Sequence, residues 1–196
     1  MITILFGPPG CGKGTQAAII SERFSLPHVS TGEMLRGEVA TGSDLGNEVE
    51  PIMKNGGLIP DSVMVRIIER RLAQPDAAPG VLLDGFPRTV PQARELDDML
   101  EGSGREIGVV LVFDVPETEL QKRIAHRAEI DHRADDTPEA FVKRMREYEA
   151  KTAPVVDYYK DRGTRVEYVN GNASIAAVTD SILAIFGDQS PRGEAA

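Results

Sequence analysis

The chain has 196 residues, of which 41% are hydrophobic and 27% charged, the composition of a globular protein with enough apolar residues for a core. Its formal net charge of -9 argues against broad binding of nucleic acid or adhesion to anionic membranes, because both need a basic surface. A single cysteine, Cys11, rules out an internal disulfide, and the sequence has no Cys/His cluster typical of structural zinc.

The apolar run at the N-terminus does not have the pattern of a secretory signal. It stops at Gly7 and lacks a basic leader. No apolar stretch approaches the roughly 20 residues needed to cross a bilayer. We therefore expect a cytoplasmic protein with no membrane partner.

Short apolar segments alternate with longer helical patterns along the chain. In chain order we expect a strand at 2–6, a helix at 13–24, a strand at 28–30, three helical segments broken by Gly42, Gly56-Gly57 and Pro60, and strands at 81–84, 107–113 and 165–169. Thr137 and Pro138 begin a further helix, with Thr as the N-cap and Pro at the first helical position.

This alternation predicts an α/β fold, a three-layer α/β/α arrangement with a five-stranded parallel sheet. In such sheets ligands bind beyond the carboxyl ends of the strands. We therefore expect the site after Phe6, Ser30, Asp84 and Asp114. We predict one domain over 1–188 and a disordered tail over 189–196, because the tail is polar and contains Ser190-Pro191 and Gly193.

The segment after the first strand has the spacing of a phosphate-binding P-loop, with Gly7 followed after four residues by Gly12-Lys13. Glycines let backbone N–H groups surround a phosphate, the helix N-terminus adds partial positive charge, and Lys13 adds a full charge. The predicted ATP contacts in this loop are Gly10, Cys11, Gly12, Lys13, Gly14 and Thr15.

Two residues of the loop leave alternatives open. Gly14 stands where P-loops usually have Ser or Thr, so Mg²⁺ would be held more through water and phosphate than through a direct hydroxyl ligand. Cys11 is either a small space-filling residue or a thiol made reactive by the helix terminus and Lys13.

Three further segments resemble the nucleoside monophosphate kinases, and specifically the adenylate kinase family, over nearly the whole chain from Ile2 to about Phe186. In the segment Ser30-Thr31-Gly32-Glu33-Met34-Leu35-Arg36, the resemblance implies that Thr31 and Arg36 contact AMP. Without the other motifs, these residues read as an N-cap and a surface arginine.

The second segment is Asp84-Gly85-Phe86-Pro87-Arg88-Thr89, followed by Gln92, and it is the most diagnostic motif of that family. Asp84 ends a strand where P-loop enzymes keep a carboxylate for the metal or its waters. Arg88 is placed to grip a monophosphate with two donors. The resemblance implies that Gln92 reads adenine, which favours AMP over UMP or CMP. It also places Gly85, Phe86 and Pro87 at the AMP site.

The third segment is Gly56-Gly57-Leu58-Ile59-Pro60-Asp61. By resemblance, Gly57, Leu58 and Ile59 line the adenine pocket of AMP, partly through backbone groups. A plain helix-to-helix turn describes the same residues equally well.

Four arginines follow on the next helices. Arg123 and Arg127 are four residues apart and share a helix face, Arg133 lies in the following loop, and Arg144 lies on the next helix. Acidic neighbours also fit an ordinary solvated face. The resemblance implies instead that Arg127 contacts ATP and that Arg133 and Arg144 bridge the AMP phosphate and the transferring group. The predicted catalytic residues are Lys13, Arg88, Arg123, Arg133 and Arg144.

The resemblance also implies two small mobile parts. One is an AMP-binding insertion at about 30–59. The other is a short lid at about 126–136, without the four cysteines of a zinc lid. The histidines His28, His126 and His132 are expected at the surface or in packing. Near Ala173 we expect a backbone contact to the adenine of ATP.

The predicted function is adenylate kinase activity, ATP + AMP ⇌ 2 ADP, with Mg²⁺ accompanying ATP and no zinc. The expected partners are ATP, AMP and ADP, and the enzyme is expected to be a monomer. The alternatives are a UMP/CMP or broad-specificity monophosphate kinase, and a nucleotide-binding module without transfer activity. The module has no reason to keep Arg88, Arg123, Arg133 and Arg144 together.

Overall fold

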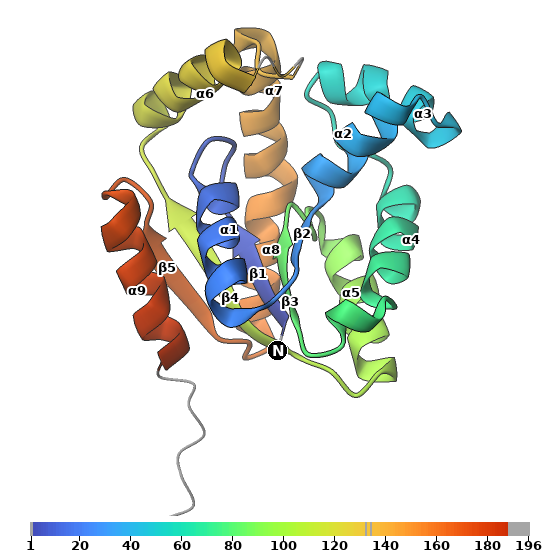
Figure 1. Cartoon of the computed structure of the whole chain (residues 1–196), viewed down its shortest axis with the longest axis vertical. Helices are drawn as coiled ribbons and strands as arrows, with labels where there is room; N and C mark the ends of the chain where they lie inside the picture. Colours follow the sequence, from blue (N-terminus) through green and yellow to red (C-terminus); the bar gives the residue numbers. More distant parts are fainter. Residues whose placement is uncertain (1, 132, 134, 188–196) are drawn as a thin grey trace, which may run out of the picture.

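A computed structural model describes residues 2–131, 133 and 135–187. Strands and helices alternate through the chain (Figure 1). The elements are β1 (Ile2–Phe6), α1 (Lys13–Phe24), β2 (His28–Ser30), α2 (Thr31–Thr41), α3 (Asp44–Lys54), α4 (Asp61–Leu72), a 3₁₀ turn (Pro75–Ala77), β3 (Val81–Asp84), α5 (Val90–Gly102), β4 (Ile107–Asp114), α6 (Glu117–Asp131), α7 (Pro138–Glu147), a π-helical turn (Tyr148–Thr152), α8 (Ala153–Asp161), β5 (Val166–Asn170) and α9 (Ile175–Gly187).

The strands form one five-stranded sheet in the order β2-β3-β1-β4-β5, and every pairing is parallel. At its centre, Ile4 of β1 lies opposite Leu83 on one side and Val110 on the other. Parallel neighbours need crossover connections, and the helices between the strands supply them. The predicted three-layer α/β fold is thus confirmed.

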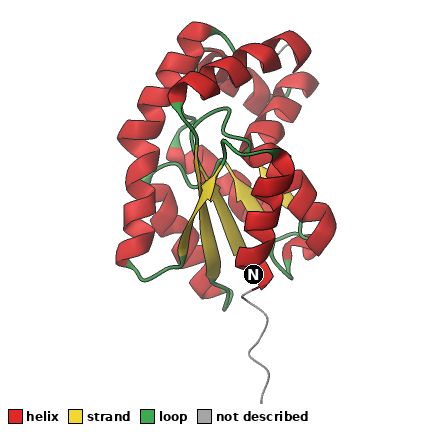
Figure 2. Ribbon diagram, turned by 90° about the vertical axis from the view of Figure 1, so that its left-hand side faces the viewer, coloured by secondary structure: helices red, strands yellow, loops and turns green. Residues whose placement is uncertain are grey.

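Alternate residues of the strands enter two separate cores, one on each face of the sheet (Figure 2). On one face, β1 residues such as Ile4 pack with apolar residues of α4, α5 and α8. On the other, Leu5 packs with residues of α1, α6 and α9. Both sheet faces are therefore covered, which explains why the inner strands β1, β3 and β4 are nearly continuous apolar runs, whereas the edge strands β2 and β5 include polar residues.

The predicted helix starts are confirmed where a capping residue identified them. The Thr137 side chain accepts a hydrogen bond from the Ala140 backbone N–H, and Ser30 caps α2 in the same way by accepting from Glu33. Two strands end one residue later than predicted, because Asp114 of β4 pairs in register with Asn170 of β5. The backbone of a polar residue at a strand end can still form the hydrogen bonds of the sheet. A prediction based on apolar residues ends the strand before such a residue.

Two helical pairs stand beyond the carboxyl ends of the strands (Figure 1): α2 with α3, and α6 with α7. The predicted AMP-binding insertion at about 30–59 contains α2 and α3, and the predicted lid at about 126–136 begins in α6; both stay predictions. Among the described residues, no helix combines the length and apolar character needed to span a bilayer. The predicted disordered tail and His132 lie outside the described residues.

Candidate active site

A cleft of about 760 Å³ lies at the carboxyl edge of the sheet, bounded by the loop after β1 and by the two helical pairs. Most of the predicted site residues line it. They are Gly10, Cys11, Gly12, Lys13, Gly14, Thr15, Thr31, Arg36, Gly57, Leu58, Ile59, Asp84, Gly85, Arg88, Gln92, Arg123, Arg127, Arg133, Arg144 and Ala173.

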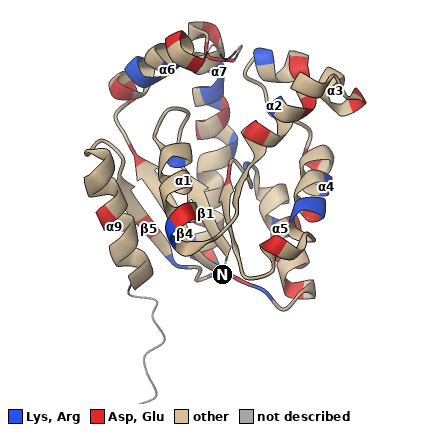
Figure 3. Ribbon diagram, in the orientation of Figure 1, with Lys and Arg blue, Asp and Glu red and all other residues tan. Residues whose placement is uncertain are grey.

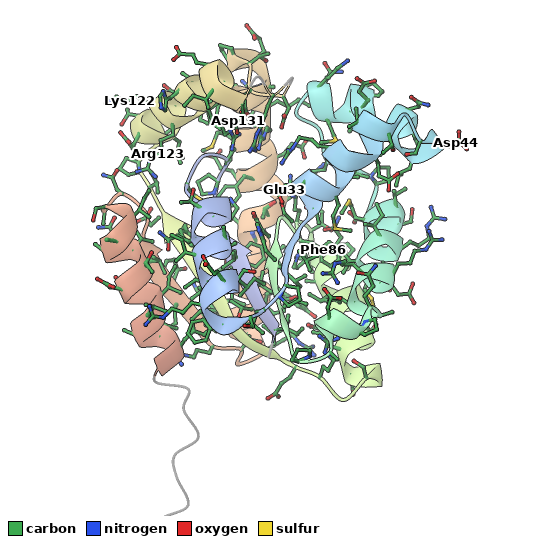
Figure 4. The ribbon with its side chains drawn as sticks, viewed as in Figure 1. Glu33, Asp44, Phe86, Lys122, Arg123 and Asp131 are labelled. Carbon is green, nitrogen blue, oxygen red and sulfur yellow. The ribbon has the colours of Figure 1, made fainter. Side chains whose placement is uncertain are left out.

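Two residues predicted for the AMP site do not line this cleft. Phe86, labelled in Figure 4, is buried in the core on the α4 and α5 face. Pro87 lines a neighbouring cavity of about 70 Å³. In this arrangement both residues support the turn that carries Arg88, and their side chains lie away from the main cleft.

The loop after β1 has the backbone geometry that its glycines predict. Gly10 and Gly12 have φ angles of 85° and 98°, which side-chain-bearing residues rarely adopt. Gly12 is the N-cap of α1, so the helix begins at Lys13 with its N-terminus at the cleft. The Lys13 ammonium donates to the carbonyl oxygens of Gly7 (2.7 Å) and Pro8 (3.0 Å), so the lysine side chain lies against the loop.

Asp84 ends β3 directly below this loop. His28 of β2 lies beside it, with Nε2 3.4 Å from Asp84 Oδ2. Burial alone would raise the pKa of Asp84, but the His28 contact and the charges of Lys13 and Arg88 hold it below its usual value. A Cβ added to Gly14 would lie 3.8 Å from Asp84 Oδ2, so Gly14 leaves the space before this carboxylate open.

The histidine next to Asp84 was not singled out by the sequence. His28 had been assigned to surface or packing, and its side chain is only 14% exposed. The contact between His28 and Asp84 depends on the pairing of β2 with β3, in which Ser30 lies opposite Asp84. The exposed His126 fits the surface assignment, with a side chain that is 73% exposed.

The turn after β3 joins three predicted residues of the acceptor site. Gly85 has a φ of 82°, and its carbonyl oxygen accepts hydrogen bonds from Thr31 Oγ1 (3.0 Å) and Arg88 Nε (2.8 Å). Burial lowers the pKa of Arg88, and nearby Asp84 and Asp135 oppose that shift. The guanidinium is therefore held by its own turn, with donors remaining for a phosphate.

Two neighbouring carboxylates in the segment of the predicted lid, those of Asp135 and Asp136, pair with two of the predicted arginines. Arg127 makes a two-pronged contact with Asp136 (2.6 and 2.5 Å), and Arg144 contacts Asp135 (3.0 Å) and Asp136 (3.2 Å). The Asp136 side chain is fully buried. Burial lowers the pKa of Arg144 to about 10. Arginines and carboxylates are mixed over the helices at the top of Figure 3. The same arginines therefore both pair with acidic side chains and line the cleft.

Two further arginines are placed by single ion pairs. Arg133 contacts Asp131 at 2.8 Å. Arg123 lies on α6 (Figure 4), contacts Glu119 at 3.1 Å and donates to the Gly171 carbonyl oxygen at 3.0 Å. The latter bond ties α6 to the loop after β5, the loop that contains Ala173.

The insertion side of the cleft contains a small polar site among apolar side chains. Gln92 is 2% exposed, its oxygen accepts from the Arg88 backbone N–H, and its nitrogen donates to Asp61. Leu35, Met53 and Met64 line the cleft beside Gly57, Leu58 and Ile59. Sequence reasoning missed these three, because apolar residues at helical spacing look the same whether they face a core or a ligand.

At the opposite end of the cleft, Ala173, Ile175 and Val178 surround a second apolar region. Gln16 on α1 donates to the Ile175 carbonyl oxygen (3.0 Å) and accepts from Thr179 (2.8 Å), which holds α9 against α1. Gln16 was not predicted. Its one available signal was its position on α1, directly after the predicted contacts of the P-loop.

Comparison with known proteins agrees with this geometry. The family model described as adenylate kinase matches residues 5–164. Proteins named adenylate kinase are similar over nearly the whole chain: 45% identity in Stenotrophomonas maltophilia K279a (94% of this chain, 98% of that protein), 46% in Caulobacter sp. K31 (93% and 96%), and 40% in Methanothrix thermoacetophila (95% and 98%).

Adenylate kinases are nucleoside monophosphate kinases, a class of phosphotransferase enzymes, and the P-loop, the turn after β3 and the arginines of this chain are the parts that such an enzyme needs. The family model covers the P-loop, the turn after β3 and the arginines, and the three relatives match 93 to 95% of the chain. The chain belongs to the adenylate kinase family.

Proposed function

We propose that this enzyme catalyses ATP + AMP ⇌ 2 ADP, with ATP on the P-loop and AMP between the turn after β3 and the insertion. One observation carries the assignment of both subsites: a single cleft connects Lys13 of the P-loop, the Arg88 turn and the buried Gln92 amide. A cleft that only held ATP would not need the second phosphate-binding turn or the second base pocket.

In the proposed mechanism the transfer is in line between the two nucleotides. Protein side chains form no covalent bond to the phosphoryl group, so catalysis depends on positioning and on charge. Lys13 and Arg123 would act from the ATP side and Arg88 from the AMP side, with Arg133 and Arg144 between them. Lys13 would exchange its contacts with the loop carbonyl oxygens for phosphate oxygens. No general base is required, because the AMP phosphate is already anionic.

The proposed nucleotide contacts follow the same division. Gly10 to Thr15, Arg127 and the backbone near Ala173 would bind ATP. Thr31, Arg36, Gly57, Leu58, Ile59, Gly85, Arg88 and Gln92 would bind AMP, with Arg133 and Arg144 shared with the transferring group. Phe86 and Pro87 would contribute by supporting the Arg88 turn.

The residues at the P-loop fit a Mg²⁺ ion that accompanies ATP. Asp84 is a carboxylate kept ionised by its neighbours, and Gly14 leaves room in front of it for water. Among the described residues, no group of three or more His, Cys, Asp or Glu side chains could hold a metal by itself. Mg²⁺ usually keeps several waters and uses substrate phosphates, so we propose that Asp84 would hold it through water. When bound, Mg²⁺ would neutralise charge on the phosphates.

We propose that 126–136 forms a short lid and that 30–59 forms the AMP-binding part. Their closure would keep water from accepting the phosphoryl group. The Methanothrix relative aligns over 212 positions while covering 95% of this chain, so it has residues that this chain lacks.

We further propose that the enzyme acts as a cytoplasmic monomer and binds neither nucleic acid nor membrane. The net charge of -9 supports the absence of these polyanionic partners. Sedimentation or light scattering at micromolar concentration would test the monomer, and a dimer mass would contradict it.

The proposed reaction is tested by measuring ADP formed from ATP and AMP by the wild-type enzyme and by Lys13→Met and Arg88→Ala. We expect wild-type turnover and a loss of roughly 10²-fold or more in kcat/KM for each variant, since each removes charge from the transferring or accepting phosphate. A wild-type protein that binds ATP but forms no ADP with AMP would refute the proposal. A panel of AMP, UMP, CMP and GMP tests the acceptor, and a preference for a pyrimidine nucleotide would refute the assignment of Gln92.

A further inference from the structure

The Gln92 amide is held at both of its ends by groups that can act in only one way. Its Oε1 accepts from the Arg88 backbone N–H at 2.7 Å, and its Nε2 donates to Asp61 Oδ1 at 2.7 Å. A backbone N–H can only donate, and an ionised carboxylate can only accept. Rotating the amide by 180° would break both hydrogen bonds. It would place the amide nitrogen against the Arg88 N–H and the amide oxygen against the Asp61 carboxylate. The two neighbours therefore specify the same orientation.

Asp61 is itself fixed in this position. It is the first residue of α4, and its second oxygen accepts from Thr89 Oγ1 at 2.9 Å. Thr89 is the N-cap of α5 and accepts from the Gln92 backbone N–H at 3.2 Å. The carboxylate thus joins the starts of α4 and α5. Asp61 does not line the cleft, whereas Gln92 does.

An oriented amide leaves one N–H and one oxygen lone pair for a ligand, in a fixed spatial order. Adenine presents an acceptor, N1, beside a donor, the 6-amino group. Hypoxanthine and guanine present a donor, N1–H, beside an acceptor, O6. The order on a 6-oxopurine is therefore the reverse of that on adenine. An amide free to rotate could match either base, while an amide held in one orientation matches one order only.

We infer that Asp61 is a positioning residue that fixes the Gln92 amide and thereby sets the selectivity of the acceptor site for 6-aminopurine over 6-oxopurine monophosphates. The inference rests on the proposed function, because it concerns the base of the nucleotide that accepts the phosphoryl group. Asp61 acts through Gln92 and touches no substrate.

The test compares kcat/KM for AMP and for IMP, each with saturating ATP, in the wild-type enzyme and in Asp61→Ala. IMP differs from GMP by lacking the 2-amino group, so the comparison isolates the order of donor and acceptor from the size of the base. One well-made two-point contact discriminates between bases by about 5- to 150-fold. We expect the AMP/IMP ratio to fall by about tenfold or more in Asp61→Ala, with KM for ATP unchanged.

Two further variants separate orientation from mere polarity. Asp61→Asn keeps an oxygen that accepts from Gln92 Nε2, and because a neutral acceptor is weaker than a charged one, its AMP/IMP ratio is expected between those of wild type and Asp61→Ala. Asp61→Ser keeps a residue suited to a helix start but does not dictate the amide orientation. Its ratio should resemble that of Asp61→Ala, and it replaces that variant if Asp61→Ala does not fold.

The matched control is Asp44→Ala. Asp44 is likewise an acidic residue in the first turn of a helix, α3, but it is exposed and lies at the outer side of the insertion (Figure 4). It should leave the AMP/IMP ratio unchanged. In a Gln92→Ala background, removing Asp61 should also leave the ratio unchanged, because the group that Asp61 orients is gone.

The outcomes distinguish this inference from the proposed function. If Asp61→Ala lowers kcat/KM for AMP and IMP in equal proportion, Asp61 serves stability alone and the inference is overturned. The same holds if the ratio still changes in the Gln92→Ala background. If the wild-type enzyme makes no ADP from AMP, the proposed function fails before any variant is compared.

Discussion

At Gly85 two segments of the proposed acceptor site meet, since its carbonyl oxygen accepts hydrogen bonds from both Thr31 and Arg88. The backbone can turn there because a φ of 82° costs glycine little. The space around Gly85 is also closed. An added Cβ would lie 2.5 Å from Thr31 Oγ1 and 2.9 Å from Arg88 Nη2. At the scale of one residue, then, both conformation and contact require glycine.

Gly85→Ala is therefore expected to raise KM for AMP by about tenfold or more and to destabilise the fold by about 1–3 kcal/mol, through the left-handed backbone and the displaced side chains. KM for ATP should change little. Steady-state kinetics and urea unfolding measure both effects. Gly37→Ala is the control, because Gly37 lies within α2 with no atom within 4 Å of an added Cβ. It should stabilise by about 0.5–1 kcal/mol. If Gly85→Ala and Gly37→Ala change KM for AMP and stability equally, position 85 does not specifically require glycine.

A second prediction at this scale concerns Asp84. Its pKa is lower in the folded protein than in the unfolded chain, so its contribution to stability is present above about pH 4 and is lost as the pH falls through the lower folded-state value. We expect Asp84→Asn to flatten the fall in unfolding free energy below about pH 4. Denaturant titrations from pH 2 to 7 measure this, with the exposed Asp44→Asn as control. If the unfolding free energy of Asp84→Asn falls as steeply below about pH 4 as that of the wild type, the claim that ionised Asp84 stabilises the fold is wrong.

At the scale of elements, the insertion depends on the close approach of α2 and α3. Gly46 in α3 lies so near the C-terminal part of α2 that an added Cβ would overlap the Glu38 carbonyl oxygen and lie 2.8 Å from the Val39 nitrogen. These neighbours are backbone atoms, which move only with the whole helix. This contact therefore fixes the distance between α2 and α3. Arg36 lies on α2, so its position depends on that distance.

Gly46→Ala is expected to push α3 away from α2 and to displace the AMP side of the cleft. We expect KM for AMP to rise several-fold and stability to fall by about 1–3 kcal/mol, with KM for ATP near the wild-type value. Kinetics with each nucleotide varied in turn measure the difference. A parallel rise of both KM values would show instead that the damage reaches the P-loop.

Local signals predicted most of the elements. The helix from Lys13 follows from the glycine loop and ends where predicted, and the helix at Pro138 follows from its N-cap. The P-loop lysine was predicted from motif spacing, whereas the roles of the arginines were predicted from the family resemblance and stay predictions. The apolar strands fixed the sheet and, through it, the edge at which the cleft lies.

The contacts between distant segments could not be predicted in this way. Asp61 and Gln92 are 31 positions apart, and nothing in either segment specifies the other. His28 beside Asp84 required knowledge of which strands are neighbours. Asp136 was noted as an acidic neighbour of the arginines, but its burial beneath Arg127 depends on how α6 and α7 meet. Local pattern finds donors and acceptors; only packing determines their partners.

At the scale of the whole molecule, the sheet separates two cores, and the cleft lies where both end. Residues of α1, α6 and α9 from one core line the end of the cleft proposed for ATP, while α4 from the other core borders the end proposed for AMP. A ligand that fills both ends therefore contacts elements from both faces of the sheet. Such a ligand should therefore stabilise the elements on both faces of the sheet together.

We expect a two-headed diadenosine polyphosphate to raise the melting temperature more than ATP or AMP alone at the same concentration, because a ligand that fills both ends has a lower Kd. At about 100 times Kd a ligand adds about 2.7 kcal/mol, which for a domain of this size corresponds to roughly 5–10 °C. Differential scanning fluorimetry measures the shift. Lys13→Met and Arg88→Ala should each reduce it. A shift no larger than that given by ATP would indicate that only one end is occupied.

The pairing of Arg127 and Arg144 with Asp135 and Asp136 has a consequence for the ionic conditions under which the enzyme works. The lid carries its own counter-ions, so its arginines need not gather chloride or phosphate from solution. Nucleotide binding then exchanges one fixed anion for another and releases few small ions. The dissociation constant of ATP should consequently vary less steeply with salt than the number of arginines implies, which a plot of log Kd against log salt concentration measures.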